Sequence, residues 1–421
     1  MISILLSALK IIFLLGFLIG IHETGHFLMA KLCKVRVNEF AIGFGPTIWQ
    51  KQGKETKYAL RLFPLGGFVN MEGEEEHSEK EGSFSKASIL KRVLIVAAGA
   101  TVNIVFAILI YFILSSTSIN NTSNIVSGLE ENFAASEAGI EAGDEILKIN
   151  NKKIRTSKDI NDAIKSSDEV IVKIKRNNEI KELKIKPTEI KYNSTGIYLP
   201  ALEEKSTKIV ALEPKSAGEK SGLKQGDLII KINDEDVKDN EEKVLEILQK
   251  DTEKEDVKYK FLVERNGKEQ EIEVVPDKLS SYYLGVNLKL PEDNLGNRLY
   301  YAMYDTNEFL LSMVENVKRL FTGEVSTAQL VGPVGISEVV AKTNGFKEFI
   351  YILAVISMSL GVTNLLPFPP LDGGKILFLI IEKIRRKPLK QETELKIQML
   401  GFAFLMVISI IVTYNDILRL F

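Results

Sequence analysis

The chain has 421 residues, of which 45% are hydrophobic and 26% are charged, and its formal net charge is −2. Because 54 Lys and Arg residues nearly balance 56 Asp and Glu residues, there is no overall basic field, and nucleic acid is not an expected partner. The apolar residues form long blocks near both ends of the chain, on either side of a polar middle. Blocks of this length exclude a purely soluble protein.

The first apolar block runs from Ile11 to Ala30 and contains the string His22-Glu23-Thr24-Gly25-His26. On a helix, residues four apart lie on one face, so both imidazoles can bind one metal ion. Glu23 lies beside them, where it can take a proton from water. Ionisable residues at membrane depth are costly and indicate function. The alternative is a polar cluster that is hydrogen-bonded inside a helix bundle.

The segment from Val35 to Met71 alternates apolar and polar residues around glycine-rich turns, which predicts β-strands. The pattern leaves open whether these strands enter the membrane or lie on the headgroups. An acidic stretch follows and holds the third histidine of the chain, His77, which we expect to be solvated. The second apolar block, Val93 to Leu114, has no charged residue and predicts a second span.

The polar middle of the chain contains an internal duplication. The string G-x-x-x-G-D-x-I-(L/I)-K-I-N occupies residues 139–150 and recurs at residues 222–233, a constant offset of 83 residues. A fixed period of this size indicates two copies of one small domain, and the string resembles the PDZ domain in its bacterial, protease-associated form. PDZ domains bind peptide ends by strand addition. Capture of peptide ends, a size filter on substrates and a rigid spacer all remain open as roles.

The third apolar block runs from Phe349 to Leu366 and continues, interrupted by prolines, through Leu371 to Ile381. Asp372 lies inside it, and a catalytic zinc site needs a third protein ligand besides two histidines. Irregular backbone at membrane depth is tolerated where it lines protein or a wet cavity, so Asp372 is the expected third ligand. The alternative is a carboxylate that caps a helix C-terminus near the interface, with Lys375 as its partner.

The fourth apolar block, Ile397 to Asn415, is again uncharged. Basic residues are concentrated between the first and second blocks and between the third and fourth. By the positive-inside rule, both of these loops are expected in the cytoplasm. Both chain termini and the duplicated middle then lie outside the cytoplasm.

Taken together, these motifs resemble the site-2 protease family of intramembrane zinc metalloproteases, in its bacterial regulator of sigma-E protease branch. The resemblance extends nearly from end to end. It rests on the H-E-x-x-H string, the two PDZ-like copies and Asn364-x-x-Pro367-x-x-x-Leu371-Asp372-Gly373. Further matching strings are GFGP at residues 43–46, PLGGFV at 64–69 and GPVGI at 332–336.

The resemblance implies one zinc ion per chain, bound by His22, His26 and Asp372, with Glu23 as the catalytic base. It also implies that Asn364 and Asn103 contact the substrate, and that the strands of residues 35–71 dip into the membrane. The family usually has Gly-Pro-x-x-Asn at the start of the second span, whereas residues 99–103 here lack the proline. The bend expected at that proline is therefore in question.

We therefore expect a polytopic α-helical membrane protein with about four transmembrane helices, a membrane-associated β-hairpin region and two extracytoplasmic α+β PDZ-like domains. The expected segments are 1–116 (first two spans and hairpin), 124–190 and 195–290 (PDZ-like), 291–348 (amphipathic connection) and 349–421 (last two spans).

The expected activity is proteolysis of single-span membrane proteins, such as anti-sigma factors and signal-peptide remnants. The expected partners are these substrates, the lipid bilayer and peptide ends at the PDZ-like domains. The expected location is the bacterial inner (cytoplasmic) membrane, with the active site toward the cytoplasmic side. The rival hypothesis is a non-catalytic PDZ scaffold in the membrane. A zincin acting on soluble substrates is a weaker rival, since Glu23 lies at membrane depth.

Overall fold

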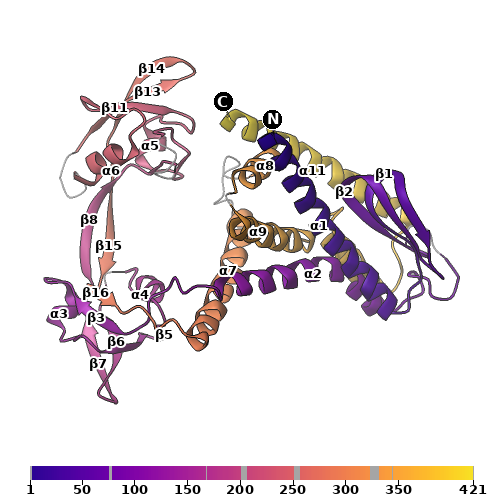
Figure 1. Cartoon of the computed structure of the whole chain (residues 1–421), viewed down its shortest axis with the longest axis horizontal. Coiled ribbons are helices and arrows are strands. Elements are labelled where there is room, and N and C mark those ends of the chain that lie inside the picture. The colour runs from indigo at the N-terminus through magenta and orange to yellow at the C-terminus, as the bar shows by residue number, and fades with distance from the viewer. Residues whose placement is uncertain are drawn as a thin grey trace. The chain divides into compact units, whose positions relative to one another are not determined.

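A computed structural model describes residues 2–74, 78–166, 168–200, 206–250, 257–322, 331–343 and 345–420. The solvated state expected for His77 lies outside these residues. The chain divides into two compact units (Figure 1). The first, the helical unit, comprises Met1–Ser118 and Arg298–Leu420, and the second, the duplicated unit, comprises Ile119–Asn297.

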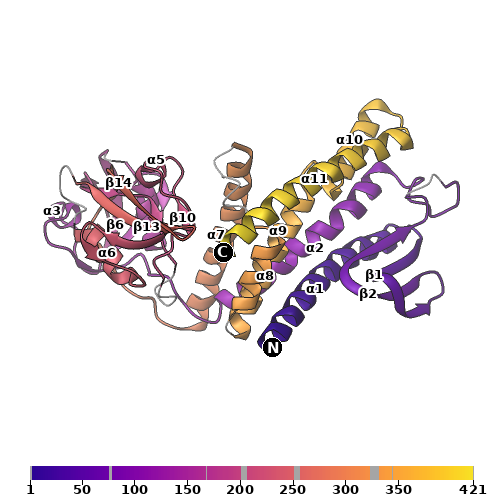
Figure 2. The same ribbon diagram turned by 90° about the horizontal axis from the view of Figure 1, so that it is seen from above.

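Four helices of the described residues are long and apolar enough to cross a membrane. These helices are α1 (Ile2–Leu32), α2 (Ile89–Ser115), α9 (Phe346–Asn364) and α11 (Gln391–Leu420). Figure 2 shows α1, α2 and α9 running side by side. The four predicted spans are therefore confirmed, each with the roughly 20 residues that a bilayer requires.

Three further helices complete the helical unit, namely α7 (Leu295–Thr322), α8 (Pro333–Lys342) and α10 (Asp372–Arg385). The ring of Phe309 in α7 stacks on that of Tyr111 in α2, with ring centroids 4.3 Å apart. The short helix α8 is held at both ends. The carboxylate of Asp416 accepts hydrogen bonds from backbone N–H groups at its start, and the ammonium of Lys10 donates to the Thr343 carbonyl at its end. Both charges have the sign that the helix dipole favours.

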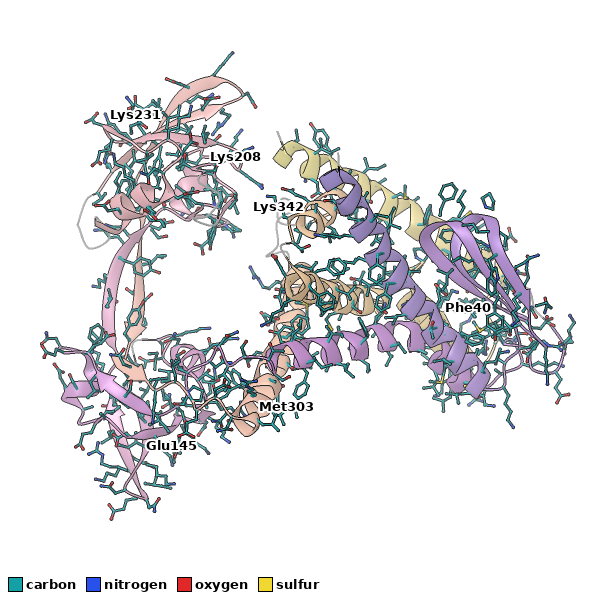
Figure 3. All side chains as sticks on the ribbon, viewed as in Figure 1. Phe40, Glu145, Lys208, Lys231, Met303 and Lys342 are labelled. Atoms are coloured by element: carbon teal, nitrogen blue, oxygen red, sulfur yellow. The ribbon has the colours of Figure 1, made fainter. Side chains whose placement is uncertain are left out.

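The predicted strands of residues 35–71 form a compact antiparallel sheet from β1 (Val37–Gln52) and β2 (Lys57–Met71). Each strand bends, so residues 37–42 pair with residues 57–60 on one side and with residues 67–71 on the other. Phe40 joins the sheet to α1 through the ring of Phe27, with centroids 5.2 Å apart (Figure 3). Within the described residues, no strand pairs with the outer edge of residues 67–71, which we call the edge segment.

The duplicated unit contains two four-stranded antiparallel sheets with the same strand order, β5-β4-β6-β7 and β12-β11-β13-β14. The duplication in sequence is thus a duplication in structure. The first copy has β4 (Glu145–Ile149), β5 (Lys152–Lys153), β6 (Val170–Arg176) and β7 (Glu179–Ile185), with helices α3 (Ala134–Glu137) and α4 (Ser157–Ala163). The second has β11 (Leu228–Ile232), β12 (Glu235–Asp236), β13 (Tyr259–Arg265) and β14 (Lys268–Val274), with α5 (Ala217–Lys220) and α6 (Glu241–Lys250).

The two copies exchange one short strand each. An antiparallel ribbon of β8 (Thr188–Ser194) and β15 (Asp277–Tyr283) runs between the two sheets (Figure 1). After β8, the chain enters the second copy, where β9 (Ile197–Tyr198) pairs with β10 (Ala211–Leu212). After β15, it returns to the first copy, where β16 (Val286–Leu288) pairs with β3 (Val126–Leu129). The second copy therefore contains β9, which follows the strands of the first copy in sequence. The first copy contains β16, which follows the strands of the second copy.

Candidate metal centre

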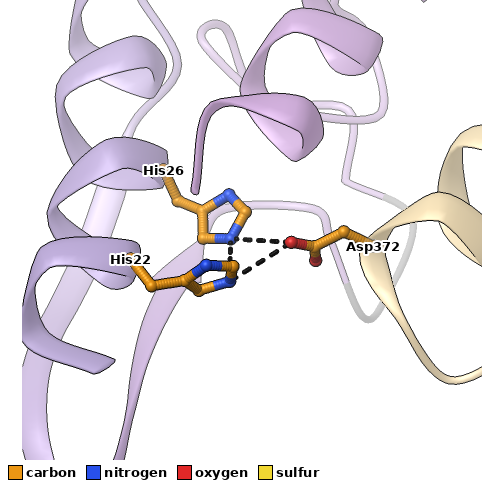
Figure 4. Close-up of side chains that lie close together, drawn as sticks. All are labelled: His22, His26 and Asp372. Carbon is orange, nitrogen blue, oxygen red and sulfur yellow. Dashed lines mark hydrogen bonds and ion pairs between the residues drawn. The ribbon is translucent and has the colours of Figure 1, made fainter. Parts of the chain in front are cut away.

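The H-E-x-x-H string lies on α1 and brings its two imidazoles to one point. The Nε2 atoms of His22 and His26 are 3.1 Å apart (Figure 4). The Oδ2 atom of Asp372 lies 3.2 Å from Nε2 of His22 and 3.4 Å from Nε2 of His26. Side chains from α1 and α10, far apart in the sequence, thus meet within the helical unit.

Close contact between α1 and α2 sets the position of the histidines. A Cβ atom at Gly25 would lie 2.6 Å from the carbonyl oxygen of Ala98, and one at Gly99 would lie 2.4 Å from Nε2 of His26. No side chain fits in either place, so the two glycines allow the backbones to touch and leave room for the imidazole. The helix α2 runs through this point without interruption, although it lacks the proline of the family pattern.

Each imidazole is oriented by a contact at its other nitrogen. Nδ1 of His26 lies 2.9 Å from the carbonyl oxygen of Ile95, an acceptor that places the proton on Nδ1 and leaves Nε2 free to bind a metal. Nδ1 of His22 lies 3.4 Å from the side-chain amide of Asn103, which is fully buried. That contact is made by the amide nitrogen; the amide oxygen of Asn103 has no hydrogen-bond partner among the described residues, and a half-turn of the carboxamide would let it accept the Nδ1 proton.

Asp372 is the first residue of α10. The helix α9 ends at Asn364, the prolines of residues 367–370 form a tight turn, and α10 then begins. A Cβ atom at Gly373 would lie 2.2 Å from the carbonyl oxygen of Leu366, so a glycine is required where the turn folds over the helix start. The alternative of a C-terminal cap is wrong, because Asp372 begins a helix.

Lys375 is not the partner of Asp372. Its Nζ atom lies 2.9 Å from Oε1 of Glu74, in the loop that follows β2. Among the described residues, the salt bridge between Lys375 and Asp372 that the capping alternative expects is therefore not formed.

The three side chains fit a zinc ion. Tetrahedral zinc bonds of about 2.0–2.1 Å place neighbouring ligand atoms roughly 3.3–3.4 Å apart, close to the distances measured here. Oδ2 of Asp372 is buried and accepts no hydrogen bond from the described part of the chain, although it faces two ring nitrogens. Among the described residues, His22, His26 and Asp372 form a group whose ligand atoms lie close enough to share one metal ion. A cation satisfies the buried oxygen and both nitrogens together.

Glu23 lies between the metal-binding group and the β-sheet. A Cβ atom at Gly67, in the edge segment, would lie 2.9 Å from Cγ of Glu23. The backbone of the edge segment therefore passes directly beside the Glu23 side chain. The family resemblance implies a β-structure of residues 35–71 beside the active site, with an edge that can take an unwound substrate as an added strand, but it does not identify Gly67 as the residue next to Glu23.

The remaining predicted site residues lie at two different places. Asn103 is at the metal-binding group, behind His22. Asn364 is half-buried and is the last residue of α9. It lies seven residues before Leu371, the residue that precedes α10. The substrate-binding roles of both residues stay predictions. The carbonyl of Ile95 was not anticipated, because a backbone acceptor leaves no signal in the residue types.

The chain is similar to known proteins over nearly its whole length. A model of peptidase family M50 matches residues 10–408. The chain is similar to the regulator of sigma E protease of Haemophilus influenzae, with 28% identity over 99% of the chain and 100% of that relative. It is also similar to protease RseP of Yersinia pestis (28%, all of both chains) and to zinc metalloprotease RasP of Oceanobacillus iheyensis (28%, 99% of each).

Proposed function

The chain belongs to peptidase family M50 and is a zinc metalloprotease, and we propose that it cuts peptide bonds within or beside the membrane segments of single-span proteins. The observation that carries this proposal is the place of the site. His22, Glu23 and His26 lie on α1, one of the four helices long and apolar enough to span a membrane. A peptide bond must therefore reach them at membrane depth. The rival hypothesis of a non-catalytic scaffold is not supported.

In this proposal His22, His26 and Asp372 bind the zinc ion. Zinc bound there supplies Lewis acidity, which makes water easier to ionise and polarises a carbonyl group. Glu23 takes the proton of the attacking water and delivers it to the leaving amine nitrogen. Asn103 and the Ile95 carbonyl keep the two imidazoles turned toward the metal.

The edge segment gives the substrate a place to bind. A peptide bond inside a helix is shielded by its own hydrogen bonds, so cleavage requires local unwinding. The free N–H and C=O groups of residues 67–71 can pair with an unwound substrate as an added strand. Because the edge segment passes beside Glu23, such a strand would bring its peptide bonds to the base. Asn364 and Asn103 are proposed as further substrate contacts.

We infer a membrane position from side chains that face outward. The β1–β2 sheet exposes large apolar side chains, among them Phe44, Ile48, Trp49 and Phe63. Exposed apolar surface of this kind suits lipid better than water. The proposed location is the cytoplasmic membrane of a bacterium, with the loops between α1 and α2 and between α10 and α11 in the cytoplasm. The duplicated unit, proposed as two PDZ-like domains, then lies outside the cytoplasm.

The test is to locate the bond that is cut. The chain is co-expressed with single-span reporter proteins, and the products are mapped by mass spectrometry. We expect cleavage inside or within a few residues of the apolar segment of the reporter, absent with Glu23→Gln and present with Glu131→Gln, which removes an exposed carboxylate of the duplicated unit. Cleavage confined to a soluble domain of the reporter would contradict the proposal.

A further inference from the structure

A strongly basic cavity lies away from the metal centre, where α1 ends and α2 begins. Its volume is about 790 Å³. Six basic side chains line it, and only two acidic ones do. The basic residues are Lys31, Lys34, Arg36, Lys80, Lys86 and Lys91, and the acidic residues are Glu55 and Glu81.

Half of the basic side chains are already neutralised. Lys31 lies 2.9 Å from Glu55, and the pKa of Glu55 lies below its usual range because Lys31 donates a hydrogen bond to it. Lys80 and Lys86 pair with Glu72 and Glu79, at 3.1 Å and 3.0 Å.

Three basic side chains of the cavity lack such a partner. Lys34, Arg36 and Lys91 are exposed and have no carboxylate within ion-pair distance among the described residues. The Nζ atom of Lys91 donates to the Cys33 carbonyl oxygen, at 3.4 Å. The cavity therefore presents an unbalanced positive charge that attracts an anion.

The wall of the cavity is an ordered structure. The backbone N–H of Arg36 donates to the carbonyl of Gly82, at 2.8 Å, and Lys91 reaches across from the start of α2 to Cys33. The end of α1, the loop of residues 80–87 and the first turn of α2 are thus tied together. Basic side chains from three segments therefore line one cavity. The positive-inside rule depends only on the number of Lys and Arg residues in a loop, so it does not explain why they gather in one place.

Exposed apolar side chains occupy the same helix turns as two of the residues that line the basic cavity. Leu32 and Leu90 are 76% and 70% exposed, and they are neighbours in sequence of the lining residues Lys31 and Lys91. Each lies at the terminal turn of a membrane-spanning helix. A basic hollow at the ends of two helices that are long and apolar enough to cross a membrane matches an amphiphile, with an anionic head and an apolar tail.

We propose that this cavity binds the phosphate headgroup of an anionic phospholipid. The phosphate oxygens would accept hydrogen bonds from Lys34, Arg36 and Lys91, while the acyl chains lie against Leu32 and Leu90. The cavity is connected to the β1–β2 sheet, because the carbonyl of Arg36 accepts a hydrogen bond from the N–H of Glu72, the residue that follows the edge segment. The binding itself does not depend on the proposed substrate class.

The test compares two variants with the same loss of charge. Lys34→Gln/Arg36→Gln removes two cavity charges, and Lys51→Gln/Lys54→Gln removes two exposed charges of the same loop that do not line the cavity. The full chain, purified in neutral detergent, is titrated with short-chain phosphatidylglycerol, and bound lipid is counted by native mass spectrometry. Zinc content verifies that each variant is folded.

We expect the wild type and the loop variant to bind phosphatidylglycerol equally, and the cavity variant to bind it about 10- to 30-fold more weakly. Phosphatidylcholine, which has no net charge, should bind all three weakly. Equal losses in both variants would overturn the proposal, since they would reflect general surface charge. Inorganic phosphate at the same concentration should not displace the lipid; full displacement would assign the cavity to free phosphate and overturn the lipid proposal.

Discussion

The helical turn from His22 to His26 carries two kinds of chemistry on neighbouring side chains. The imidazoles point at Asp372, with their Nε2 atoms 3.2 Å and 3.4 Å from its Oδ2 atom. The Glu23 side chain lies beside the edge segment, so close to Gly67 that a Cβ atom there would be 2.9 Å from Cγ of Glu23. If the proposed roles hold, single substitutions remove metal binding or proton transfer separately.

Replacing Asp372 tests the proposed ligand set. Asp372→Ala leaves two histidine ligands, fewer than the three that a catalytic zinc site needs, so the zinc content should fall well below the one ion per chain expected for the wild type. Zinc is measured by elemental mass spectrometry on the purified protein. Asp236→Ala, which removes an exposed carboxylate from the second copy, should keep its zinc. Full zinc and full activity in Asp372→Ala would show that another residue is the third ligand.

At the scale of elements, the repeated Gly-Asp string has a structural explanation. In the first copy the carboxylate of Asp144 accepts hydrogen bonds from Nε and Nη2 of Arg176, at 2.7 Å and 2.8 Å. In the second copy Asp227 accepts the same pair from Arg265, at 2.6 Å and 2.7 Å. Each arginine comes from the last residue of a strand, β6 or β13, and fastens it to the glycine turn.

Removing Arg176 should destabilise the first copy. Arg176→Met leaves the carboxylate of Asp144 without its cation, so the free energy of unfolding of this copy should fall. Hydrogen exchange measured by mass spectrometry should show faster exchange in β4 and β6, with β11 and β13 unchanged. Unchanged protection in β4 would contradict this role.

The same ion pair predicts a dependence on pH. Arg176 holds the pKa of Asp144 below its usual range, because it donates hydrogen bonds to the ionised carboxylate. The pair therefore stabilises the fold above the pKa of an unfolded Asp, about 3.9, and this contribution is lost as the pH falls through the lower pKa of the folded state. The first copy of the wild type should lose stability below about pH 4. Arg176→Met should lose less over the same interval, and an equal loss would exclude the pair as the cause.

At the scale of the whole molecule, the exchanged strands make the two copies depend on each other. Leu284 follows the ribbon that leaves the second copy, yet it is 2% exposed within the core of the first copy. Leu223 is equally buried in the core of the second copy. A substitution late in the chain should therefore weaken the domain formed mainly by earlier residues.

The pair Leu284→Ala and Leu223→Ala tests this dependence. Each should lower stability by about 2–5 kcal/mol, because each leaves a cavity in a packed core. Leu284→Ala should release exchange protection in β4 and β6, and Leu223→Ala in β11 and β13. If Leu284→Ala instead affected the second copy, the strand exchange would be wrong.

Much of this architecture could be read from local patterns. Spans follow from apolar length, and the duplication follows from a repeated string, so both were predicted correctly. The spacing of His22 and His26 also predicts a shared helix face. The exchange of β9 and β16 could not be predicted, since the pairing of β9 with β10 and of β16 with β3 depends on the path of the chain through the β8–β15 ribbon. The roles of Ile95 and Gly99 depend on the crossing of α1 and α2, which no local pattern records.

The proposed orientation is tested by labelling. A thiol introduced at Glu137, exposed in the first copy, should react with a membrane-impermeant reagent added outside intact cells, whereas one at Lys387, between α10 and α11, should not. Both variants carry Cys33→Ser, which removes the single native cysteine. The reverse pattern of labelling would invert the topology.

The most direct test of the central claim is the activity and zinc content of Glu23→Gln, measured together on purified protein in lipid. The account predicts about one zinc ion per chain, as in the wild type, because Glu23 is not among the three metal-binding side chains. It predicts cleavage of a single-span substrate slowed by about 10²–10⁴-fold, because the group that carries the proton is gone. Undiminished cleavage by the zinc-loaded variant would contradict the account.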